Sequence, residues 1–250
     1  ELQNAQKRFK VIDFISGSEK YISPSEEIYS LYIENNSEYN TDCFRYGYES
    51  FTTPYSIYEY DLQSCQSRLL KQQDIPGYVD SLYVSERIYA TADDGTQIPI
   101  SLVYRKNSIK SGMPNPFLLD GYGSYGDRND PYFSSVRLSL LDRGIIYGFA
   151  HVRGGGEYGK KWYEAGKMLN KKNTFSDFID CSEFLIEFGY TEPEKLVIMG
   201  GSAGGLLIGA VLNEAPHLFK AAVADVPFVD VVNTMLDSTL SATISEYEEW

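Results

Sequence analysis

The sequence predicts an α/β protein in which a mostly parallel sheet, with helices on both faces, follows a separate β-rich region. Residues 1 to about 75 contain short segments rich in aromatic and β-branched residues, with no helical pattern between them. From residue 82 onward, apolar strand-like runs alternate with segments whose apolar residues recur at spacings of three and four. We place the change around Asp74–Gly77, between a unit of residues 1–75 and a unit of residues 80–250.

The β-rich region contains four segments that predict strands, namely 9–14, 28–33, 43–51 and 56–62. Turn-forming Gly, Ser, Asn and Pro residues separate them, which is typical of a sandwich, a barrel or propeller blades. A propeller blade has four strands, so this stretch would supply one blade and part of another and would leave strand edges unpaired. We therefore expect it to be part of an incomplete β-propeller or a similar β-structure.

In the second region, the first two strands form a hairpin around Asp93-Asp94-Gly95. Further strands and three helices follow in alternation, which implies a mostly parallel sheet. The expected strands are 82–92, 98–104, 116–120, 145–152, 196–199 and 221–224, and the expected helices are 133–142, 175–188 and 203–213.

Composition limits the partners and the location. The net charge of −13 argues against nucleic acid or an anionic membrane surface as a partner and suits cationic ligands. No apolar run approaches the ~20 residues of a membrane span, and no segment resembles a signal peptide. The three cysteines, Cys43, Cys65 and Cys181, fit neither a disulfide framework nor a zinc site, so we expect a reducing, cytoplasmic location and no metal.

Residues 200–204 read Gly-Gly-Ser-Ala-Gly and match the pattern G-x-S-x-G between a predicted strand and a predicted helix. A serine on such a tight turn projects its hydroxyl out of the backbone, and small neighbours allow the chain to make the turn. The pattern predicts a nucleophile elbow and covalent hydrolysis at Ser202. The alternative is a structural turn in which the serine has no chemical role.

A serine nucleophile requires a base, normally a histidine that a carboxylate orients. His217 lies beyond the helix that follows Ser202, which places it roughly 20 Å away. His151 precedes the serine, whereas the hydrolase triad follows the chain order Ser, acid, His. Both histidines are therefore expected to be structural or exposed, and the base is missing from this sequence.

The loop Arg153–Gly159 contains glycines 154, 156 and 159 in the pattern G-x-G-x-x-G. A dinucleotide site would continue directly into an apolar helix, but residues 160–164 carry charge and no apolar stripe. A phosphate-binding loop would need Ser or Thr where Lys161 stands. We therefore expect no cofactor.

Three motifs together resemble the prolyl oligopeptidase family, and further segments resemble its oligopeptidase B branch. The resemblance covers roughly residues 43–250 and is faint in the first forty residues. The family motifs are 120–126 (Asp-Gly-Tyr-Gly-Ser-Tyr-Gly), 151–159 (His-Val-Arg-Gly-Gly-Gly-Glu-Tyr-Gly) and 200–205 (Gly-Gly-Ser-Ala-Gly-Gly), and the segments of the branch are 137–144, 227–232 and 246–250.

The resemblance implies a seven-bladed propeller that caps an α/β-hydrolase domain. Residues 1–75 would be its closing blades, and residues 80–250 the first two-thirds of the catalytic domain. It also implies that Ser202 is the nucleophile and that the Ala203 N–H and the Tyr122 hydroxyl hold the oxyanion, where one donor is worth about 3 kcal/mol. The acid and the histidine of the family would lie beyond Trp250.

The oligopeptidase B branch cleaves after Lys or Arg in short peptides, and the resemblance places Glu246 and Glu248 in the pocket for that side chain. Alternate positions of an extended segment point the same way, so the two carboxylates would converge on one guanidinium. Asp130 matches an acidic position of the neighbouring subsite. Tyr132 stands where the branch usually has a second carboxylate, so we expect a weaker basic preference there.

We therefore expect a serine endopeptidase that acts on short basic peptides, without cofactor, nucleic acid or membrane, in association with the rest of its own polypeptide. As an isolated chain we expect it to be inactive. Two alternatives stay open. One is a prolyl oligopeptidase that cleaves after proline, and the other is a binding or structural fragment that lacks its base.

Overall fold

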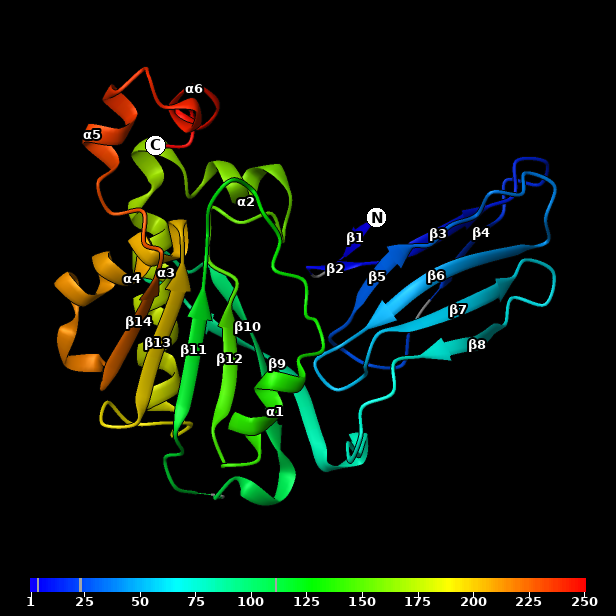
Figure 1. The fold of residues 1–250 in the computed structure, drawn as a ribbon, viewed down its shortest axis with the longest axis horizontal. Coiled ribbons are helices and arrows are strands. Elements are labelled where there is room, and N and C mark those ends of the chain that lie inside the picture. Colours follow the sequence, from blue (N-terminus) through cyan, green and yellow to red (C-terminus); the bar gives the residue numbers. More distant parts are fainter. Residues whose placement is uncertain (4, 23, 111) are drawn as a thin grey trace.

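The computed structural model describes residues 1–3, 5–22, 24–110 and 112–250. Figure 1 shows a β-rich N-terminal unit beside a larger unit built around one central sheet. The two units are joined through the segment between strands β8 and β9, where the sequence changes its character.

Three small antiparallel sheets make up the described part of the N-terminal unit. The largest has four strands in the order β5-β6-β7-β8, which is the arrangement of a propeller blade, and the hairpin β3–β4 lies beside it. A core that includes Tyr29, Tyr46, Tyr48 and Tyr60 lies between blade and hairpin. The strands are β1 (Leu2–Gln3), β2 (Gln6–Lys7), β3 (Phe9–Ile12), β4 (Glu19–Ile22), β5 (Ser30–Ile33), β6 (Cys43–Glu49), β7 (Ser56–Asp61) and β8 (Ser67–Gln72).

All four predicted strands of this region are present, as β3, β5, β6 and β7. The sequence patterns do not predict the short strands β1 and β2, nor β4 and β8. Strand β8 reads Ser-Arg-Leu-Leu-Lys-Gln and is exposed along its whole length, so neither alternation nor aromatic residues mark it as a strand. Its pairing with β7, rather than its own sequence, makes it a strand.

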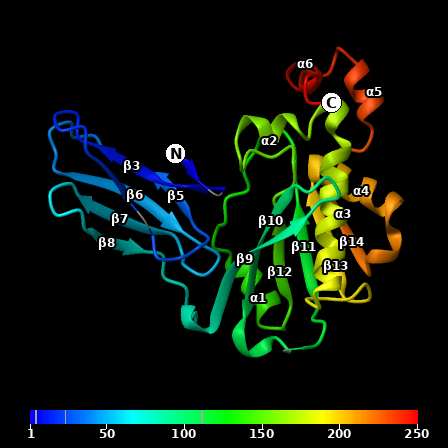
Figure 2. The same cartoon turned by 180° about the vertical axis from the view of Figure 1, so that it is seen from behind.

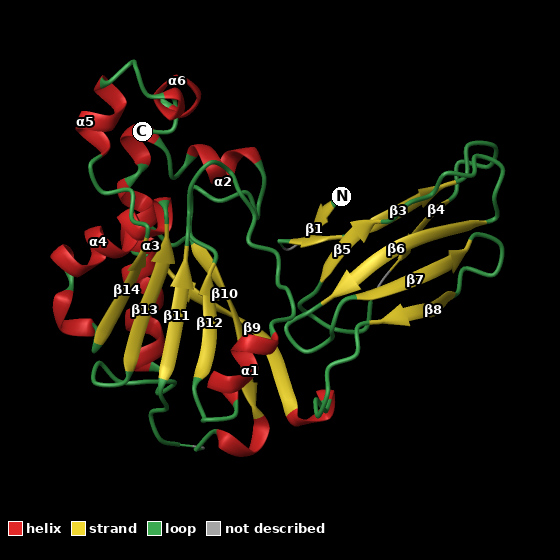
Figure 3. Cartoon of the chain, in the orientation of Figure 1, coloured by secondary structure: helices red, strands yellow, loops and turns green. Residues whose placement is uncertain are grey.

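The sheet of the larger unit has six strands in the order β14-β13-β11-β12-β10-β9 (Figure 3). Strands β12, β11, β13 and β14 run parallel, whereas β9 and β10 form an antiparallel hairpin at one edge. The predicted mostly parallel sheet is confirmed. The strands are β9 (Tyr83–Thr91), β10 (Gln97–Arg105), β11 (Phe117–Gly121), β12 (Ile146–Ala150), β13 (Leu196–Gly201) and β14 (Ala221–Asp225).

Helices cover both faces of this sheet, as the strand-helix alternation predicts. Helices α3 (Lys172–Glu187) and α4 (Ala203–Glu214) pack on one face, where Phe178 and Leu207 enter the main core (Figure 2). Helix α1 (Ser135–Leu141) packs on the opposite face, and Ile28 and Phe51 of the N-terminal unit join the core cluster there. The N-terminal unit thus covers part of the sheet.

Three short helices, α2 (Lys160–Glu164), α5 (Val231–Leu236) and α6 (Ser241–Glu246), were not predicted. Helix α6 contradicts the expected extended segment at residues 246–248. Thr243 and Glu249 are buried, and Glu246, midway between them in sequence, is half-buried. Burial in this segment therefore recurs every three residues. That period belongs to a helical face. Within the described ranges, none of the helices is long and apolar enough to span a membrane.

Candidate active site

Ser202 occupies a sharp turn between β13 and α4, as the G-x-S-x-G pattern predicts. Its backbone φ is +54°, a conformation that residues other than glycine rarely adopt. Two backbone hydrogen bonds hold the turn. The Ser202 N–H donates to the Asp225 carbonyl (2.9 Å), and the Ser202 carbonyl accepts from the Phe228 N–H (3.0 Å). The residue is exposed, so a strained turn presents this hydroxyl to solvent.

Glycines bring the turn close to the end of β11. A Cβ atom on Gly200 would lie 2.4 Å from the Gly204 carbonyl oxygen, and one on Gly204 would lie 2.6 Å from the Gly121 carbonyl oxygen. Neither position has room for a side chain. This close backbone approach places Tyr122, the residue after β11, beside the first turn of α4.

Two hydrogen-bond donors therefore lie beside the Ser202 hydroxyl. Burial is the main cause that raises the pKa of Tyr122, and a hydrogen bond with the Ser202 side chain acts in the opposite direction. The raised pKa keeps the phenol protonated, so Tyr122 can donate at neutral pH. Ala203 is the first residue of α4, and an N–H group at that position has no partner within its own helix.

The loop that carries Tyr122 packs on the glycine-rich loop 153–156. A Cβ atom on Gly154 would lie 2.1 Å from the Gly123 carbonyl oxygen, and the Gly126 N–H donates to the Gly154 carbonyl (3.0 Å). The Gly156 N–H donates to the Asp127 carbonyl (2.9 Å). The glycines thus allow the two backbones to approach closely. Their N–H groups donate to carbonyls of the protein and do not point toward a phosphate site.

A buried ion pair fixes this second loop to helix α3. The Arg153 guanidinium donates to both carboxylate oxygens of Asp177 at 2.6 to 3.1 Å, and Asp177 is fully buried. Asp94, in the β9–β10 turn, accepts from the same guanidinium. These bonds raise the pKa of Arg153, against the effect of its burial. The pair therefore positions the loop against which the Tyr122 loop packs.

Neither histidine is placed to serve Ser202. The ring nitrogens of His151 lie 2.7 Å from the Ser101 hydroxyl and 3.3 Å from the Glu157 carboxylate, and the side chain is buried. His217 is exposed and lies in a short 3₁₀ helix beyond the far end of α4. Within the described ranges, neither histidine lies at the turn of Ser202.

The predicted pair of pocket carboxylates does not converge as expected. Glu246 is half-buried and accepts from the Tyr125 hydroxyl (2.6 Å), and the Tyr125 ring packs edge-on against Trp250. Glu248 is exposed. The argument from an extended segment was wrong, because α6 and the turn after it put positions 246 and 248 on different sides. Their role in binding a basic side chain stays a prediction.

Sequence reasoning missed a largely buried cation in this region. Lys171 donates to the Gly123 carbonyl (2.8 Å) and approaches Glu249 (3.4 Å), and its ammonium lies 4.8 Å from the ring centre of Trp250. Burial lowers the pKa of Lys171 to about 8, against the effect of Glu249. Two adjacent lysines at 171 and 172 look like a solvated surface pair, so the sequence carries no signal for this contact.

Asp130 is already paired with two cations. One Arg128 nitrogen lies 2.6 and 2.7 Å from its two oxygens, and the Lys7 ammonium, from strand β2, lies 2.6 Å from one of them. Tyr132 is half-exposed, and its carbonyl accepts from Arg137 (3.0 Å). Neither contact was predicted. Lys7 is far from Asp130 in sequence, whereas Arg128 is only two residues away from it.

A cavity of about 270 Å³ lies next to the serine turn and Asp130. Five of the eleven residues that line it are aromatic, and the others include Gly201 and Asp120. Burial raises the pKa of Asp120 to about 6, although the Tyr147 hydroxyl donates to it (2.9 Å) and lowers it. The aromatic walls are Phe51, Tyr122, Tyr132, Tyr147 and Phe149.

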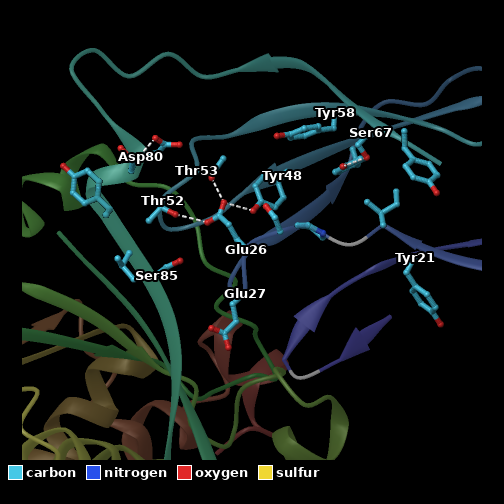
Figure 4. Close-up of a pocket in the computed structure, with 18 of the residues that line it drawn as sticks. Tyr21, Glu26, Glu27, Tyr48, Thr52, Thr53, Tyr58, Ser67, Asp80 and Ser85 are labelled. Carbon is cyan, nitrogen blue, oxygen red and sulfur yellow. Dashed lines mark hydrogen bonds between the residues drawn. The ribbon is translucent and has the colours of Figure 1, made fainter. Parts of the chain in front are cut away.

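A larger cavity, of about 920 Å³, lies between the N-terminal unit and β9 (Figure 4), and Ser202 is not among the residues that line it. Its most polar feature is Glu26, whose carboxylate accepts hydrogen bonds from the hydroxyls of Tyr48 (2.7 Å), Ser50 (2.6 Å), Thr52 (2.8 Å) and Thr53. This carboxylate is saturated by neighbouring hydroxyls, so the cavity is not the candidate active site. Among the described residues there is also no cluster that could hold a metal ion.

The sheet order, the serine turn between β13 and α4, and the helices on both faces define part of an α/β-hydrolase domain. Two family descriptions match the chain: "Prolyl oligopeptidase family" at residues 131–250 and "Prolyl oligopeptidase, N-terminal beta-propeller domain" at residues 1–73. The chain belongs to the prolyl oligopeptidase family. The resemblance found in the sequence, and the propeller origin of the first strands, are confirmed.

Several known proteins are similar over nearly the whole chain. Dipeptidyl aminopeptidase BI of Pseudoxanthomonas mexicana is 49% identical over 100% of this chain and 34% of that protein. Protease 2 of Moraxella lacunata is 44% identical over 94% of this chain and 34% of that protein. The structure of oligopeptidase B from Trypanosoma brucei, with covalently bound antipain, matches with a TM-score of 0.92 and 43% identity, over 99% of this chain and 36% of that one. The chain thus spans about a third of the length of each.

Proposed function

We propose that this chain carries the nucleophile of a serine endopeptidase that cleaves short peptides after Lys or Arg. The observation that carries the proposal is the strained turn that presents Ser202 beside the Tyr122 hydroxyl and the start of α4. Membership of a serine peptidase family supports hydrolysis, and the covalently bound antipain in the Trypanosoma brucei relative supports covalent attack.

In the proposed reaction, Ser202 Oγ attacks the peptide carbonyl carbon and its proton passes to a base. The carbonyl oxygen becomes an oxyanion, and the Ala203 N–H and the Tyr122 hydroxyl donate to it. Collapse of the intermediate breaks the C–N bond, releases the amine with a proton, and leaves an acyl-enzyme that water then hydrolyses. Only the base and its carboxylate partner are missing from this description.

The preference for Lys or Arg is proposed for the wall near α6. Glu246 lies against Tyr125, close to the Tyr122 loop, and its charge helps to raise the pKa of Tyr122, after burial and Asp127. Glu248 is exposed. It would reach the substrate's Lys or Arg side chain together with Glu246 only if the segment after α6 moves. Buried charge-assisted bonds to a guanidinium would then fix the residue to be cleaved.

We propose that further polypeptide supplies the acid and the histidine and covers the edge of the sheet. Strand β14 is exposed over most of its length, and Val226 and Val232 beside it are 77% and 69% exposed. Exposed apolar faces of this kind mark interaction surfaces. We keep residues 1–75 as the closing blades, which would limit substrate size, and residues 80–250 as the catalytic part. We also propose a cytoplasmic location, which the free thiols of Cys43, Cys65 and Cys181 support.

The test compares this chain with a polypeptide that is extended to the length of its relatives. A fluorophosphonate probe is expected to label Ser202 weakly or not at all in the isolated chain, because the base is missing, and strongly in the extended polypeptide. Ser202→Ala is the control for labelling at other sites. Robust labelling of the isolated chain would contradict the argument for a missing base. Arginyl and prolyl chromogenic substrates then separate the two family activities, and cleavage after proline alone would refute the proposal.

A second candidate function is the removal of dipeptides from free N-termini, because a relative that is 49% identical is named a dipeptidyl aminopeptidase. Paired substrates with a free or an acylated N-terminus decide between the two. An endopeptidase accepts the acylated peptide at a similar kcat/KM. A dipeptidyl aminopeptidase loses most of its activity on it.

A further inference from the structure

We propose that Lys171 is a positioning residue for the reaction at Ser202, because its ammonium ties the loop that carries Tyr122 to the segment 246–250. In this way it keeps the Tyr122 hydroxyl beside the serine. The inference rests on the proposed function for the role of Tyr122 as an oxyanion donor. Lys171 acts through the loop and not on the substrate directly.

The first contact of Lys171 is with the loop, directly after Tyr122. Its ammonium donates to the Gly123 carbonyl (2.8 Å) and to the hydroxyl of Ser124, which is fully buried. The backbone φ of Gly123 is +69°, and glycine adopts many conformations at similar cost, so contacts from outside must fix the course of the loop. Charge-assisted hydrogen bonds are roughly twice as strong as neutral ones, which suits the ammonium to this role.

The second contact of Lys171 is with the segment 246–250. The ammonium lies 3.4 Å from the Glu249 carboxylate, which is 2% exposed, and 4.8 Å from the ring centre of Trp250. A cation at that distance from an indole ring is attracted to it. The Met168 N–H also donates to the Glu249 carbonyl (2.9 Å), so the chain just before α3 holds residue 249 twice. The lysine thus lies between the loop and the segment and contacts both.

Trp250 extends this connection to the serine turn. Its ring packs edge-on against Tyr125 of the Tyr122 loop, with 5.8 Å between the ring centres. On another side it packs against Phe228 at 5.2 Å, and the Phe228 N–H donates to the Ser202 carbonyl (3.0 Å). A displacement of the segment would therefore reach both the nucleophile and the loop of its candidate oxyanion donor.

A lysine at position 171 has two electrostatic costs. Its side chain is only 12% exposed, and an ammonium loses hydration on burial. Lys171 is also the N-cap residue of α3, where the helix dipole disfavours a cation, and its side chain makes no cap hydrogen bond. Local rules are broken in this way mainly at functional or strained positions. The contacts with the loop and the segment, rather than the helix, account for this lysine.

The protonation of Lys171 gives a readout that a purely structural role would not move. Burial lowers the pKa of Lys171 to about 8, against the effect of Glu249, whereas the ordinary value is 10.5. Between these two values the unfolded chain binds the proton and the folded chain does not, so this group makes the fold more stable as the pH rises. The ammonium contacts are lost over the same range. Activity should therefore fall above about pH 8, although this lysine does not destabilise the fold there.

The phenols at this junction do not titrate near pH 8. Burial is the main cause that raises the pKa of Tyr163, Tyr125 and Tyr122, so all three stay protonated there. An alkaline change near pH 8 is therefore assigned to Lys171. The other charged groups that face the junction from neighbouring segments are Asp127, Lys167, Glu246, Glu248 and Glu249.

The experiment uses the polypeptide extended to the length of its relatives and an arginyl chromogenic substrate. Lys171→Met should lower kcat about tenfold or more and change KM less than about twofold, because a displaced oxyanion donor acts in the transition state. Lys171→Arg keeps the charge, so it should retain most of kcat and move the alkaline fall of kcat to higher pH. Lys172→Met is the matched control, because Lys172 is exposed, and should leave kcat, KM and the pH profile unchanged.

A double-variant comparison shows whether the lysine acts through Tyr122. Tyr122→Phe removes the hydroxyl, so adding Lys171→Met to it should change kcat by less than about twofold. Where Lys171→Met does not fold because Glu249 is left unpaired, Lys171→Met with Glu249→Gln removes both charges and takes its place. The inference is overturned by an unchanged kcat, by a loss confined to KM, by additive losses with Tyr122→Phe, or by an unchanged alkaline fall in Lys171→Arg.

A measurement without turnover separates this inference from the proposed function. Amide hydrogen exchange of residues 123–126 in the extended polypeptide should be about tenfold faster in Lys171→Met than in Lys172→Met, and equal rates would refute the inference. Cleavage after proline alone refutes the proposed function, and the kcat ratios are then measured on the prolyl substrate. If no peptide is cleaved, the proposed function fails, and the exchange rates alone decide whether Lys171 holds the loop.

Discussion

The two walls beside Ser202 differ in how completely this chain builds them. On the Tyr122 side, loop 121–126 packs backbone to backbone against loop 153–156, and a buried ion pair holds the latter. On the β14 side, Val223, Val232 and Leu236 are 48%, 69% and 75% exposed. The candidate oxyanion donors are preorganised within this chain, whereas the β14 side, from which we propose that a base comes, is open.

The largest effect should come from breaking the ion pair of Arg153 and Asp177, which holds the wall on the Tyr122 side. Asp177→Asn leaves the Arg153 charge buried without its main partner, so we expect the free energy of unfolding to fall by about 3–5 kcal/mol. Asp94→Asn removes the exposed partner of the same arginine and should cost less than about 1 kcal/mol. Denaturant unfolding of both variants checks this, and equal losses would show that Asp177 is not the main anchor.

The free energy of unfolding should depend on pH through Asp120, which lies on the Tyr122 side of the site. Its folded pKa, about 6, lies above the ordinary value of 3.8, so the folded state binds the proton more tightly. This contribution to stability is present below pH 3.8 and is lost as the pH rises through 6, with a total of roughly 2–3 kcal/mol. Asp120→Asn should remove this slope. Thermal unfolding of both proteins between pH 3.5 and 7 is the measurement, and parallel curves would contradict the assignment.

The close approach at the elbow can be tested with adjacent glycines. Gly200→Ala places a Cβ atom 2.4 Å from a carbonyl oxygen, and we expect it to cost about 2 kcal/mol or more. Gly201→Ala is the matched control, because the nearest atom to its Cβ would lie at 3.7 Å. We expect the control to stay within about 0.5 kcal/mol of the parent. Similar Tm values for the two variants would show that the elbow yields easily.

The smallest effect is expected on the exposed β14 side of the site. Val223→Thr on β14 should change the stability of this chain by less than about 0.5 kcal/mol, because Val223 is 48% exposed and threonine suits a strand. In the extended polypeptide, the same change should cost more than about 1 kcal/mol if further chain covers the strand. An equally small change in both proteins would argue against such a cover.

Local patterns were sufficient for the features that depend on neighbouring residues. Apolar runs and spacings of three and four predicted the sheet and its main helices, and five residues around Ser202 predicted the turn. Contacts between distant segments were not predictable in this way. The Tyr125–Glu246 bond spans 121 residues, and the pairing of Asp130 with Lys7 joins the two units. Helix α6 was missed because its short sequence shows no apolar stripe, and its contact with α5, in which the Thr243 hydroxyl donates to the Thr234 carbonyl, joins two separate segments.

The long spans across the site also bear on the order in which the molecule forms. The backbone bonds that hold the serine turn join Ser202 to Asp225 and Phe228, 23 and 26 residues away, whereas the bond of Ser30 to Pro131 spans 101 residues and that of Glu49 to Phe133 spans 84. Contacts of such separation form slowly, because a long loop must be closed before they contribute. During refolding of the whole chain, the turn at Ser202 would therefore close before the contacts between the two units. Such an order would leave the Ser202 hydroxyl without the wall at residues 130–133 until the two units dock.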